Sequence, residues 1–380
     1  MGFFYSGGGE RTVLNQAQEL QKIGHEVTVY APTVSKECFP ELQKGLNIVE
    51  FNQWVPEDLP YRSAIGMLAS SFKIPYNELK ENDVLIAHAQ PSNWIAYCIR
   101  KKFGTPYIAY LHQVNRFFKP RTIDIESGWQ TNDDIALLGI LHKGNFALKK
   151  LDKISINSAN LVLTNSNWIK QQIHDYYGVT SYVCYPGVDI EKFEYKPKRN
   201  KKIILSTNRH YPQKRIDYVL RCLKQVKEHC DDVKCVITGE YTRHTSELLK
   251  LREELDLDND VIFTGNIPTE KLIEFYENAY TYAYTSPEED FGLGPLESGA
   301  CGTPSIVWDH AGPKETVLNG VTGYRIKPYD IEDMAKHHVS LLENNELRYN
   351  LGKKASKYVH KKFTWKKHCQ ALNNYAKYIT

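Results

Sequence analysis

The sequence predicts an α/β protein of two domains, each built on a parallel sheet with helices on both faces. Three observations support this prediction. The chain has 380 residues, too long for one ordinary core but suited to two domains of under about 200 residues each. Short runs rich in β-branched residues alternate with longer helical segments, a pattern typical of parallel sheets. A strongly charged segment, residues 196–202, interrupts this alternation near the middle of the chain, and such charge runs are usually solvated linkers.

The first half begins with a helix expected over residues 10–23, where Val13, Ala17 and Leu20 share one face and Gly24 follows as a stop signal. The elements after it alternate regularly. Strands are expected at residues 26–30, 47–51, 83–88, 107–111, 161–164 and 182–185, with a helix from 92 to about 102.

The alternation restarts after the charged segment, so the domain boundary is expected within residues 191–202. Strands of the second half are expected at residues 203–205, 233–237, 261–263, 282–284 and 305–308, with helices between them. A ligand of such a protein would bind at the carboxyl ends of the strands, in the crevice between the domains.

Composition excludes several classes of protein. Hydrophobic residues make up 42% and charged residues 24%, which excludes a disordered or fibrous chain. A net charge of +3 does not indicate a nucleic-acid partner. No apolar run approaches the roughly 18–20 residues of a membrane span, and the first residues do not resemble a signal peptide. The eight cysteines lack zinc-finger spacing and are expected as reduced thiols of a cytoplasmic protein.

The densest group of chemically informative residues spans positions 287–304. Residues 280–285 are expected to form a strand and residues 295–301 a short helix, with a Gly-Leu-Gly loop at 292–294 between them. Backbone N–H groups of such a loop would face an anion at the helix N-terminus.

Two carboxylates flank this expected niche. Glu289 precedes the loop, and Glu297 falls in the first turn of the expected helix. Carboxylates suit sugar hydroxyls because they accept two hydrogen bonds at once. The alternative is that Glu297 only complements the helix dipole and that Glu289 is a loop charge.

The Glu-x7-Glu pattern, with Phe-Gly after the first Glu and Gly-x-Pro after the helix, resembles the retaining GT-B glycosyltransferases of family 4. Each motif alone is weakly specific, but their order along nearly the whole chain is a strong signal. The other matching segments are residues 7–11, 110–116, 165–166, 186–189, 208–214, 311–317, 320–323 and 363–365.

The resemblance implies the GT-B fold, in which two Rossmann-like αβα domains face a central cleft. Residues 1–193 would form the acceptor-side domain and residues 194–362 the domain that binds the nucleotide sugar. Residues 363–380 would form a helix that crosses back to the first domain.

The resemblance also implies roles for individual residues. Arg209 and Lys214 would clamp the donor diphosphate without a metal, since two fixed cations can stabilise the leaving nucleoside diphosphate. Glu297 would bind the ribose hydroxyls, and Glu289 would bind hydroxyls of the transferred sugar. The alternative for Lys214 is a place in a solvated helix start.

Further contacts to the donor are implied for backbone groups. A side chain at Gly8 would obstruct the donor phosphates, and Ile267 would offer backbone contacts to the base. On the acceptor side, His112 would lie near the reacting sugar, with Arg116 close by. The implied catalytic set is His112, Glu289, Arg209 and Lys214, and the implied donor-binding set adds Gly7, Gly8, Ile267, Phe291, Gly292, Leu293 and Glu297.

In this family the new bond keeps the anomeric configuration of the donor. No side chain of the matched motifs is an obvious nucleophile, so a same-face mechanism assisted by the leaving phosphate is expected. The segment 287–297 looks most like mannosyltransferases that use GDP-mannose, and residues 208–210 resemble an Asn-Arg-aromatic motif of dolichol-pathway mannosyltransferases. UDP-glucose, UDP-galactose and UDP-GlcNAc stay open as donors, and the acceptor could be a lipid-linked oligosaccharide, a polysaccharide or a glycoprotein glycan.

Three other functions fit the motifs less well than glycosyl transfer. A GT-B sugar-nucleotide epimerase would share the fold but would not need the two-Glu pattern. A non-catalytic binding module has no need to keep Glu289, Glu297, Arg209 and Lys214. Glycoside hydrolysis by two carboxylates is disfavoured because a hydrolase needs no Arg209–Lys214 clamp.

Three departures from the family pattern stand out. Family members begin with a complete strand before the glycine loop, whereas residues 1–5 supply at most its end, so either the natural start lies upstream or the sheet tolerates a stub. Arg215 stands where the family often has Gly, and the segment after His112 lacks a common Pro.

A basic and aromatic group in the first half predicts possible peripheral association with an anionic membrane. Its members are Lys143, Lys149, Lys150, Lys153, Phe117 and Phe118. The alternative is a solvated helix face. No nucleic-acid partner is expected, and the oligomeric state is left open.

Overall fold

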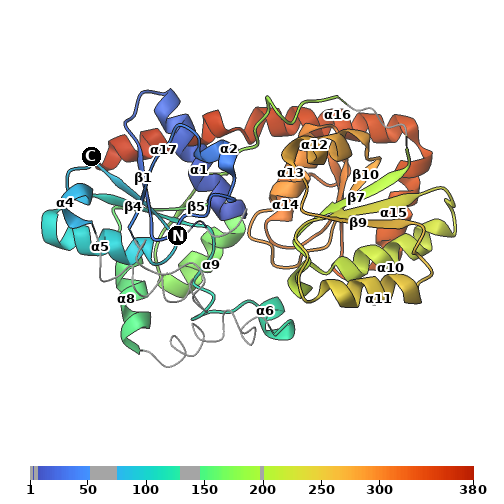
Figure 1. The fold of residues 1–380 in the computed structure, drawn as a ribbon, viewed down its shortest axis with the longest axis horizontal. Coiled ribbons are helices and arrows are strands. Elements are labelled where there is room, and N and C mark those ends of the chain that lie inside the picture. The colour runs from blue at the N-terminus through green and yellow to red at the C-terminus, as the bar shows by residue number, and fades with distance from the viewer. Residues whose placement is uncertain (1–2, 4–6, 52–74, 129–145, 197–200) are drawn as a thin grey trace. The chain divides into compact units, whose positions relative to one another are not determined.

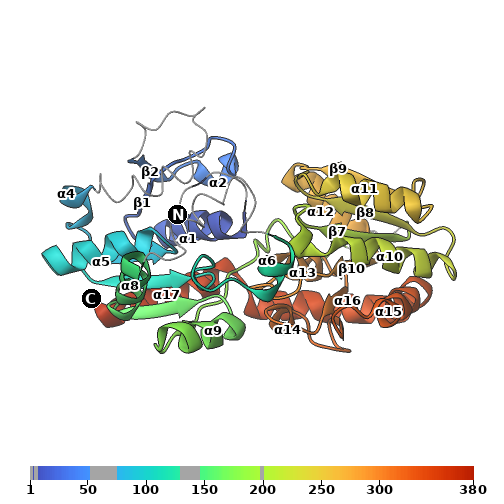
Figure 2. The same cartoon turned by 90° about the horizontal axis from the view of Figure 1, so that it is seen from below.

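The computed structural model describes residues 3, 7–51, 75–128, 146–196 and 201–380. The chain divides into two units, one formed by Met1–Gly187 with Trp365–Thr380 and the other by Val188–Thr364. Each unit holds parallel strands with helices on both sides (Figures 1 and 2).

The division falls after Gly187, whereas the sequence analysis placed it after residue 193. The reason is local pairing, because the N–H of Val188 donates to the carbonyl of Phe363 at 2.9 Å and Val188 forms a parallel bridge with Thr364. The same pairing keeps Phe363 and Thr364 in the second unit, so the C-terminal segment of the first unit begins at Trp365.

The described part of the second unit contains a six-stranded parallel sheet in the order β12-β11-β10-β7-β8-β9. Five of the strands lie where the alternation predicts them. The sixth, β12, was missed because it is a short, half-buried edge strand that begins with glycine. The strands are β7 (Ile203–Thr207), β8 (Lys234–Thr238), β9 (Val261–Gly265), β10 (Thr281–Tyr284), β11 (Ser305–Trp308) and β12 (Gly323–Ile326).

Helices cover both faces of this sheet. On one face lie α10 (Ile216–Lys227), α11 (Thr245–Glu254) and α15 (Ile331–Glu343). On the other lie α12 (Thr269–Asn278) and α13 (Leu293–Ala300), and α16 (Asn345–Lys362) packs against both α13 and α15 (Figure 1). Short helical turns complete the unit at η2 (Pro212–Lys214) and α14 (Pro313–Thr316).

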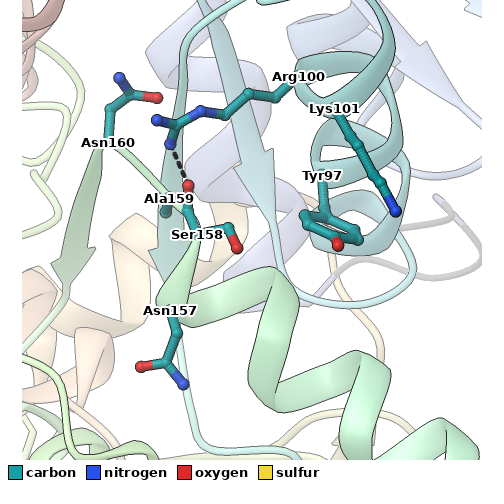
Figure 3. A pocket seen from close by; sticks show the side chains of 7 residues that line it. All are labelled: Tyr97, Arg100, Lys101, Asn157, Ser158, Ala159 and Asn160. Atoms are coloured by element: carbon teal, nitrogen blue, oxygen red, sulfur yellow. Dashed lines mark hydrogen bonds between the residues drawn. The ribbon is translucent and has the colours of Figure 1, made fainter.

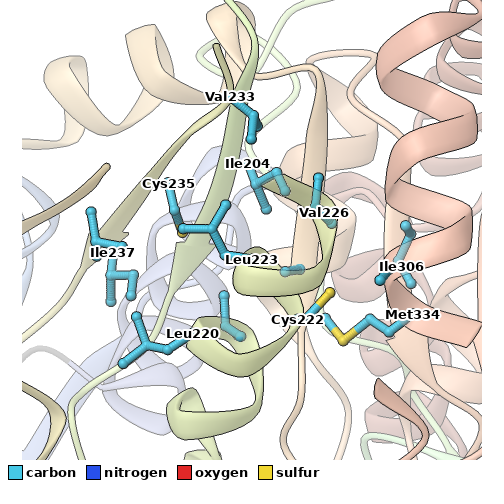
Figure 4. Packing of buried hydrophobic residues seen from close by; sticks show 14 of the residues in the cluster. Ile204, Leu220, Cys222, Leu223, Val226, Val233, Cys235, Ile237, Ile306 and Met334 are labelled. Carbon is cyan, nitrogen blue, oxygen red and sulfur yellow. The ribbon is translucent and has the colours of Figure 1, made fainter. Parts of the chain in front are cut away.

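The core of the second unit follows from the apolar stripe of α10. Leu220, Leu223 and Val226 recur at helical spacing and pack on Ile204 and Cys235 of the sheet (Figure 4). Burial of this face removes large apolar side chains from water, which is the main stabilising contribution to such a layer.

The first unit contains, among its described residues, a four-stranded parallel sheet in the order β3-β4-β5-β6 and a separate parallel pair, β1-β2. The strands are β1 (Thr28–Ala31), β2 (Asn47–Glu50), β3 (Leu85–His88), β4 (Tyr107–Leu111), β5 (Leu161–Thr164) and β6 (Tyr182–Val183). The shorter helices are α2 (Pro40–Gln43), α4 (Tyr76–Leu79) and α6 (Thr122–Glu126).

Longer helices sandwich the four-stranded sheet. One face carries α5 (Ser92–Phe103), α8 (Phe146–Asn157) and α9 (Asn167–Tyr177). The other carries α1 (Gly8–Lys22) and α17 (Trp365–Ile379), whose Cys369 and Leu372 pack on Ile108 and Leu163. The C-terminal helix therefore belongs to the core of the first unit, as the fold prediction requires.

The start of the chain contributes a single described residue to this core. Phe3 is buried and bridges Val34, its N–H donating to the carbonyl of Thr33 at 2.8 Å and its carbonyl accepting from Ser35 at 2.7 Å. Helix α1 begins at Gly8, two residues before the predicted start at residue 10.

Gly239 lies where the segment after β8 closely approaches the segment after β7 in the second unit. It follows β8 with φ +130°, and an added Cβ would lie 2.0 Å from the carbonyl oxygen of Asn208, which follows the neighbouring β7. Glycine is required here both for this conformation and for the close approach of the two backbones.

We therefore expect Gly239→Ala to lower the free energy of unfolding by about 2–4 kcal/mol, because a backbone clash adds to backbone strain. The matched control is Gly265→Ala, where φ is +68° but the nearest atom to a Cβ lies at 3.7 Å, so only the left-handed cost of about 1–2 kcal/mol applies. Urea unfolding midpoints measure both. Equal midpoints for the two variants would contradict the close approach.

Candidate functional site

The predicted donor-binding residues of the second unit come from segments that follow adjacent strands. β7 pairs with β10 at the centre of the sheet, and parallel strands end at the same edge. The segment after β7 carries Arg209 and Lys214, and the segment after β10 carries Glu289 and leads into α13 with Glu297. The topology thus gathers the cations and carboxylates of the predicted site.

Lys214 and Glu289 are in direct contact. The Lys214 Nζ lies 2.5 Å from Glu289 Oε2, and Ser286 Oγ donates to the same oxygen at 2.8 Å. The two charged side chains are 21% and 16% exposed, so a ligand from solvent can reach them although much of their surface is covered. An anion and a hydroxyl-rich sugar could each exchange contacts with this pair.

The loop that carries Arg209 and Lys214 is anchored by a buried histidine. The His210 N–H donates to the carbonyl of Glu240 at 3.0 Å, and its Nδ1 lies 3.2 Å from Thr245 Oγ1. Burial lowers the pKa of His210 to about 4, which keeps the ring neutral near pH 7. His210 appeared in the sequence analysis only as part of a motif, whereas the structure places it as the internal support of the loop.

The backbone conformation of Arg215 shows why the family often has Gly at this position. Its φ of +49° lies in the left-handed region, where a side chain costs about 1–2 kcal/mol and glycine costs none. Thr285 Oγ1 donates to the carbonyls of Lys214 at 3.0 Å and Arg215 at 2.8 Å, and these bonds hold the strained turn.

The position of Glu297 corrects the sequence analysis. Helix α13 begins at Leu293 rather than at residue 295, so Glu297 falls in the second turn and the first turn holds no acidic residue. The helix dipole acts mainly within the first turn, which weakens the interpretation of Glu297 as a dipole partner. Glu297 is 6% exposed, and Tyr276 donates to its Oε2 at 3.1 Å.

The predicted loop at residues 292–294 is the start of α13 in the structure. Gly292 is the N-cap and Leu293 the first helical residue, positions whose N–H groups lack intrahelical partners. The side chain of Phe291 is buried and packs on Phe363 with ring centroids 5.8 Å apart, so a donor contact by Phe291 would use its backbone. Ile267 is half-buried between β9 and α12.

In the first unit, His112 follows β4 and contacts a second histidine that the sequence analysis missed. His88 ends the adjacent β3, and its Nδ1 lies 3.0 Å from His112 Nε2. Burial, followed by the neighbouring His368, lowers the pKa of His112 to about 4. The signal for His88 was its place at the carboxyl end of a strand next to the one before His112.

Arg116 holds the segment after His112 to α6. Its guanidinium forms a two-point ion pair with Asp124, with Nε 2.8 Å from Oδ2, and Arg121 binds the same carboxylate. Burial would raise the pKa of Asp124, but hydrogen bonds from the two arginines lower it overall. Two cations thus share the buried Asp124 carboxylate, and an acceptor role for Arg116 stays a prediction.

The glycines at the start of the chain are part of a helix. Gly7 is the N-cap of α1, its carbonyl accepting from the Arg11 N–H at 3.0 Å, and Gly8 is the first helical residue. The predicted approach of this segment to the donor phosphates stays a prediction.

The basic group predicted to face a membrane is partly described. Lys143 lies outside the described residues. Lys149 and Lys150 are exposed on α8, and Lys153 lies 4.9 Å from the centre of the Tyr176 ring, while Phe117 and Phe118 are half-buried. No helix within the described ranges is long and apolar enough to cross a bilayer, and peripheral attachment stays a prediction.

A pocket of about 600 Å³ lies in the first unit, away from the predicted site residues. Tyr97, Arg100 and Lys101 of α5 line it together with residues 157–160 (Figure 3). Arg100 donates to the Ser158 carbonyl and Asn160 Oδ1 accepts from the Tyr107 N–H at 3.2 Å. These contacts join α5, α8 and β4, so the lining has a structural role. No cluster of three or more His, Cys, Asp or Glu suited to a metal occurs among the described residues.

Comparison with known proteins decides the family. Residues 187–358 match the family described as Glycosyl transferases group 1, and residues 6–192 match Glycosyltransferase Family 4. The chain belongs to the family 4 glycosyltransferases. This confirms the resemblance to family 4 that was stated from the motifs. The family 4 glycosyltransferase is a hexosyltransferase enzyme, and retention of configuration stays a prediction.

Curated relatives align with most of the glycosyltransferase. The alpha-1,3/1,6-mannosyltransferase ALG2 of Mus musculus is 23% identical over 85% of this chain and 81% of its own length. The ALG2 of Dictyostelium discoideum is 24% identical over 98% of this chain and 95% of its own length.

Solved structures confirm the GT-B fold. HepE of Anabaena, in complex with UDP and glucose, matches with a TM-score of 0.78 at 18% identity, covering 99% of this chain and 98% of its own. Sucrose-phosphate synthase of Thermosynechococcus elongatus matches with a TM-score of 0.77 at 17% identity, covering 98% and 94%.

The buried histidines of this glycosyltransferase predict acid lability. Burial lowers the pKa of both His112 and His368 to about 4, against roughly 6.5 in an unfolded chain. Between pH 6.5 and 4 the unfolded state therefore binds more protons, so stability is complete above pH 6.5 and is lost as the pH falls toward 4.

Urea unfolding at pH 7 and 4.5 tests this prediction. We expect the wild type to lose stability, and His368→Asn to lose less because Asn does not titrate. Asn keeps a donor for the Tyr185 carbonyl that His368 Nδ1 contacts at 2.9 Å. One such group accounts for at most about 1.4 kcal/mol per pH unit. Parallel losses in the two proteins would contradict the assignment to His368.

Proposed function

We propose that this glycosyltransferase moves mannose from GDP-mannose to a glycan or lipid-linked saccharide, with retention of configuration and without a metal. The observation that carries the transfer proposal is the contact between Lys214 and Glu289 at the end of β10, with Glu297 on the following helix. The mannosyltransferase relatives, which align with 82–98% of the chain, support the choice of sugar.

Each group has a task in this proposal. Arg209 and Lys214 bind the diphosphate and stabilise the negative charge that grows on it as the sugar leaves, the electrostatic contribution that usually dominates such catalysis. Glu289 accepts hydrogen bonds from hydroxyls of the mannose, and Glu297 accepts them from the ribose. Because Lys214 already contacts Glu289, phosphate and sugar would be recognised side by side.

Metal independence rests on the same residues. Two cations supply the charge that a divalent ion supplies elsewhere. Retention follows if the acceptor attacks the face from which the phosphate departs, which requires no protein nucleophile. His112, neutral near pH 7 because burial lowers its pKa to about 4, would orient hydroxyls on the acceptor side.

A thermal-shift panel of GDP, UDP and ADP tests the choice of donor. A nucleotide that binds only the folded state stabilises it by mass action, by about 2.7 kcal/mol at 100 times its Kd, and therefore raises Tm. We expect GDP to give the largest shift and GDP-mannose turnover to persist in EDTA. A larger shift with UDP would overturn GDP-mannose while keeping the transferase, and no shift with any nucleotide would contradict donor binding.

Substitution of the charged residues tests the roles within the site. We expect Lys214→Ala to lower kcat/KM by about 10²–10³-fold, the effect of removing one charge-stabilising group. Glu297→Ala should lower it by about tenfold or more, the effect of losing hydrogen bonds between a charged group and the ribose. Lys202→Ala is the matched control, since Lys202 pairs with Asp232 at 2.8 Å in the same unit but outside the site. Activity near that of wild type in Lys214→Ala, with Tm unchanged, would refute the diphosphate clamp.

A further inference from the structure

A chain of buried hydroxyl groups leads to Glu297. Tyr276 on α12 donates to Glu297 Oε2 at 3.1 Å, Thr207 Oγ1 at the end of β7 lies 3.0 Å from the Tyr276 hydroxyl, and Tyr282 on β10 lies 2.8 Å from the same Thr207 oxygen. Both tyrosines are fully buried. The consecutive elements α12 and β10, together with the distant β7, thus supply one continuous hydrogen-bonded path.

The carboxylate of Glu297 determines which group donates in each hydrogen bond of this path. An ionised carboxylate only accepts hydrogen bonds, so the Tyr276 proton must point to Glu297. The Thr207 proton must then point to the Tyr276 oxygen, and Thr207 accepts from Tyr282. All donors therefore point toward Glu297, and aligned donors strengthen one another in a medium of low polarity.

The tyrosine next to the carboxylate keeps its proton. Burial, followed by the charge of Glu297, raises the pKa of Tyr276 well above 10. Tyr276 is therefore a donor at every pH at which an enzyme of this kind would work.

Gly294 makes room for the far end of the path. An added Cβ there would lie 2.2 Å from the Tyr282 hydroxyl and 3.3 Å from Thr207 Oγ1. The second glycine of the Gly-Leu-Gly segment, expected in a phosphate-binding loop, thus lies inside α13 and leaves space for the hydroxyl that begins the path.

We propose that Tyr276 is a positioning residue that fixes the Glu297 carboxylate for recognition of the ribose hydroxyls of the donor, with Thr207 and Tyr282 supporting it. The proposal rests on the donor-binding role of Glu297 in the proposed function. Tyr276 itself contacts no substrate in this scheme. Its hydroxyl donates to Oε2 of Glu297. This hydrogen bond restricts rotation of the carboxylate and so fixes the direction in which Glu297 can accept further hydrogen bonds.

The test compares nucleotides that differ only in the ribose. Kd values are measured by calorimetry for GDP and UDP and for their 2′,3′-dideoxy counterparts, which lack the hydroxyls. We expect the wild type to bind a natural nucleotide about tenfold or more tighter than its dideoxy form, the factor that one hydrogen bond to a charged group represents. Tyr276→Phe should reduce this ratio to near threefold while changing the affinity for the dideoxy form little.

Two further variants make the result specific. Thr207→Val removes the donor to Tyr276 with little change of shape, and it should reduce the ratio by a smaller factor even if Tyr276→Phe fails to fold. Tyr358→Phe is the matched control, because its hydroxyl donates to the Glu315 carbonyl at 3.0 Å on α16 of the same unit. It should leave the ratio unchanged.

The outcomes separate this proposal from the proposed function. A wild type that binds no nucleotide, or binds natural and dideoxy forms equally, overturns the ribose role of Glu297 and the positioning role with it. A wild type that discriminates, a Glu297→Gln variant that does not, and a Tyr276→Phe variant that discriminates fully would overturn the positioning role alone. A merely structural tyrosine would weaken both forms equally and leave the ratio constant.

Discussion

The second unit depends on the parallel pairing of β7 with β10. Their register places Ile204 beside Thr281 and Leu205 beside Tyr282, so both strands end at one edge of the sheet although many residues separate them in the chain. The segment with Arg209 and Lys214 meets the segment with Glu289 because of this pairing, since each segment directly follows its strand. The contact of Lys214 with Glu289 is thus a consequence of strand order, and the same pairing brings Thr207 next to Tyr282.

Burial then determines how the polar groups beside these strands behave. Glu297 lies on a helix that packs on the sheet, where an unpartnered carboxylate would be costly. The Tyr-Thr-Tyr path supplies donors from within the protein, and it gives a physical reason for some of the 25 tyrosines of the chain. A phenol combines a large apolar ring, which fills the layer between sheet and helix, with one donor at its tip. Phenylalanine would fill the same space and leave the carboxylate without its donor.

Sequence reasoning reached the fold and named Lys214 and Glu289, which the structure brings into contact, but it failed where tertiary contacts override local signals. The alternation of strands and helices predicted the layers of both units, because burial on two faces produces long apolar runs. The start of α13 was misplaced because glycines favour a loop, whereas Gly294 is helical and serves the hydroxyl of Tyr282. His88 was missed and His210 was named only within a motif, because the contacts of both histidines form only when strand ends and loops come together.

In the first unit, a buried carboxylate holds the segment that carries His112. Asp152 of α8 is fully buried and accepts hydrogen bonds from Gln90 at 2.5 Å, Tyr177 at 2.9 Å and Asn115 at 3.2 Å. Burial raises the pKa of Asp152, so the donors around it offset a real desolvation cost. Asn115 lies three residues after His112, and the carboxylate therefore ties the segment carrying His112 to helices α8 and α9. In the second unit neutral hydroxyls hold the carboxylate proposed to bind the donor, whereas here a buried carboxylate holds the segment that carries His112, and in both cases the fold itself supplies the hydrogen-bond donors.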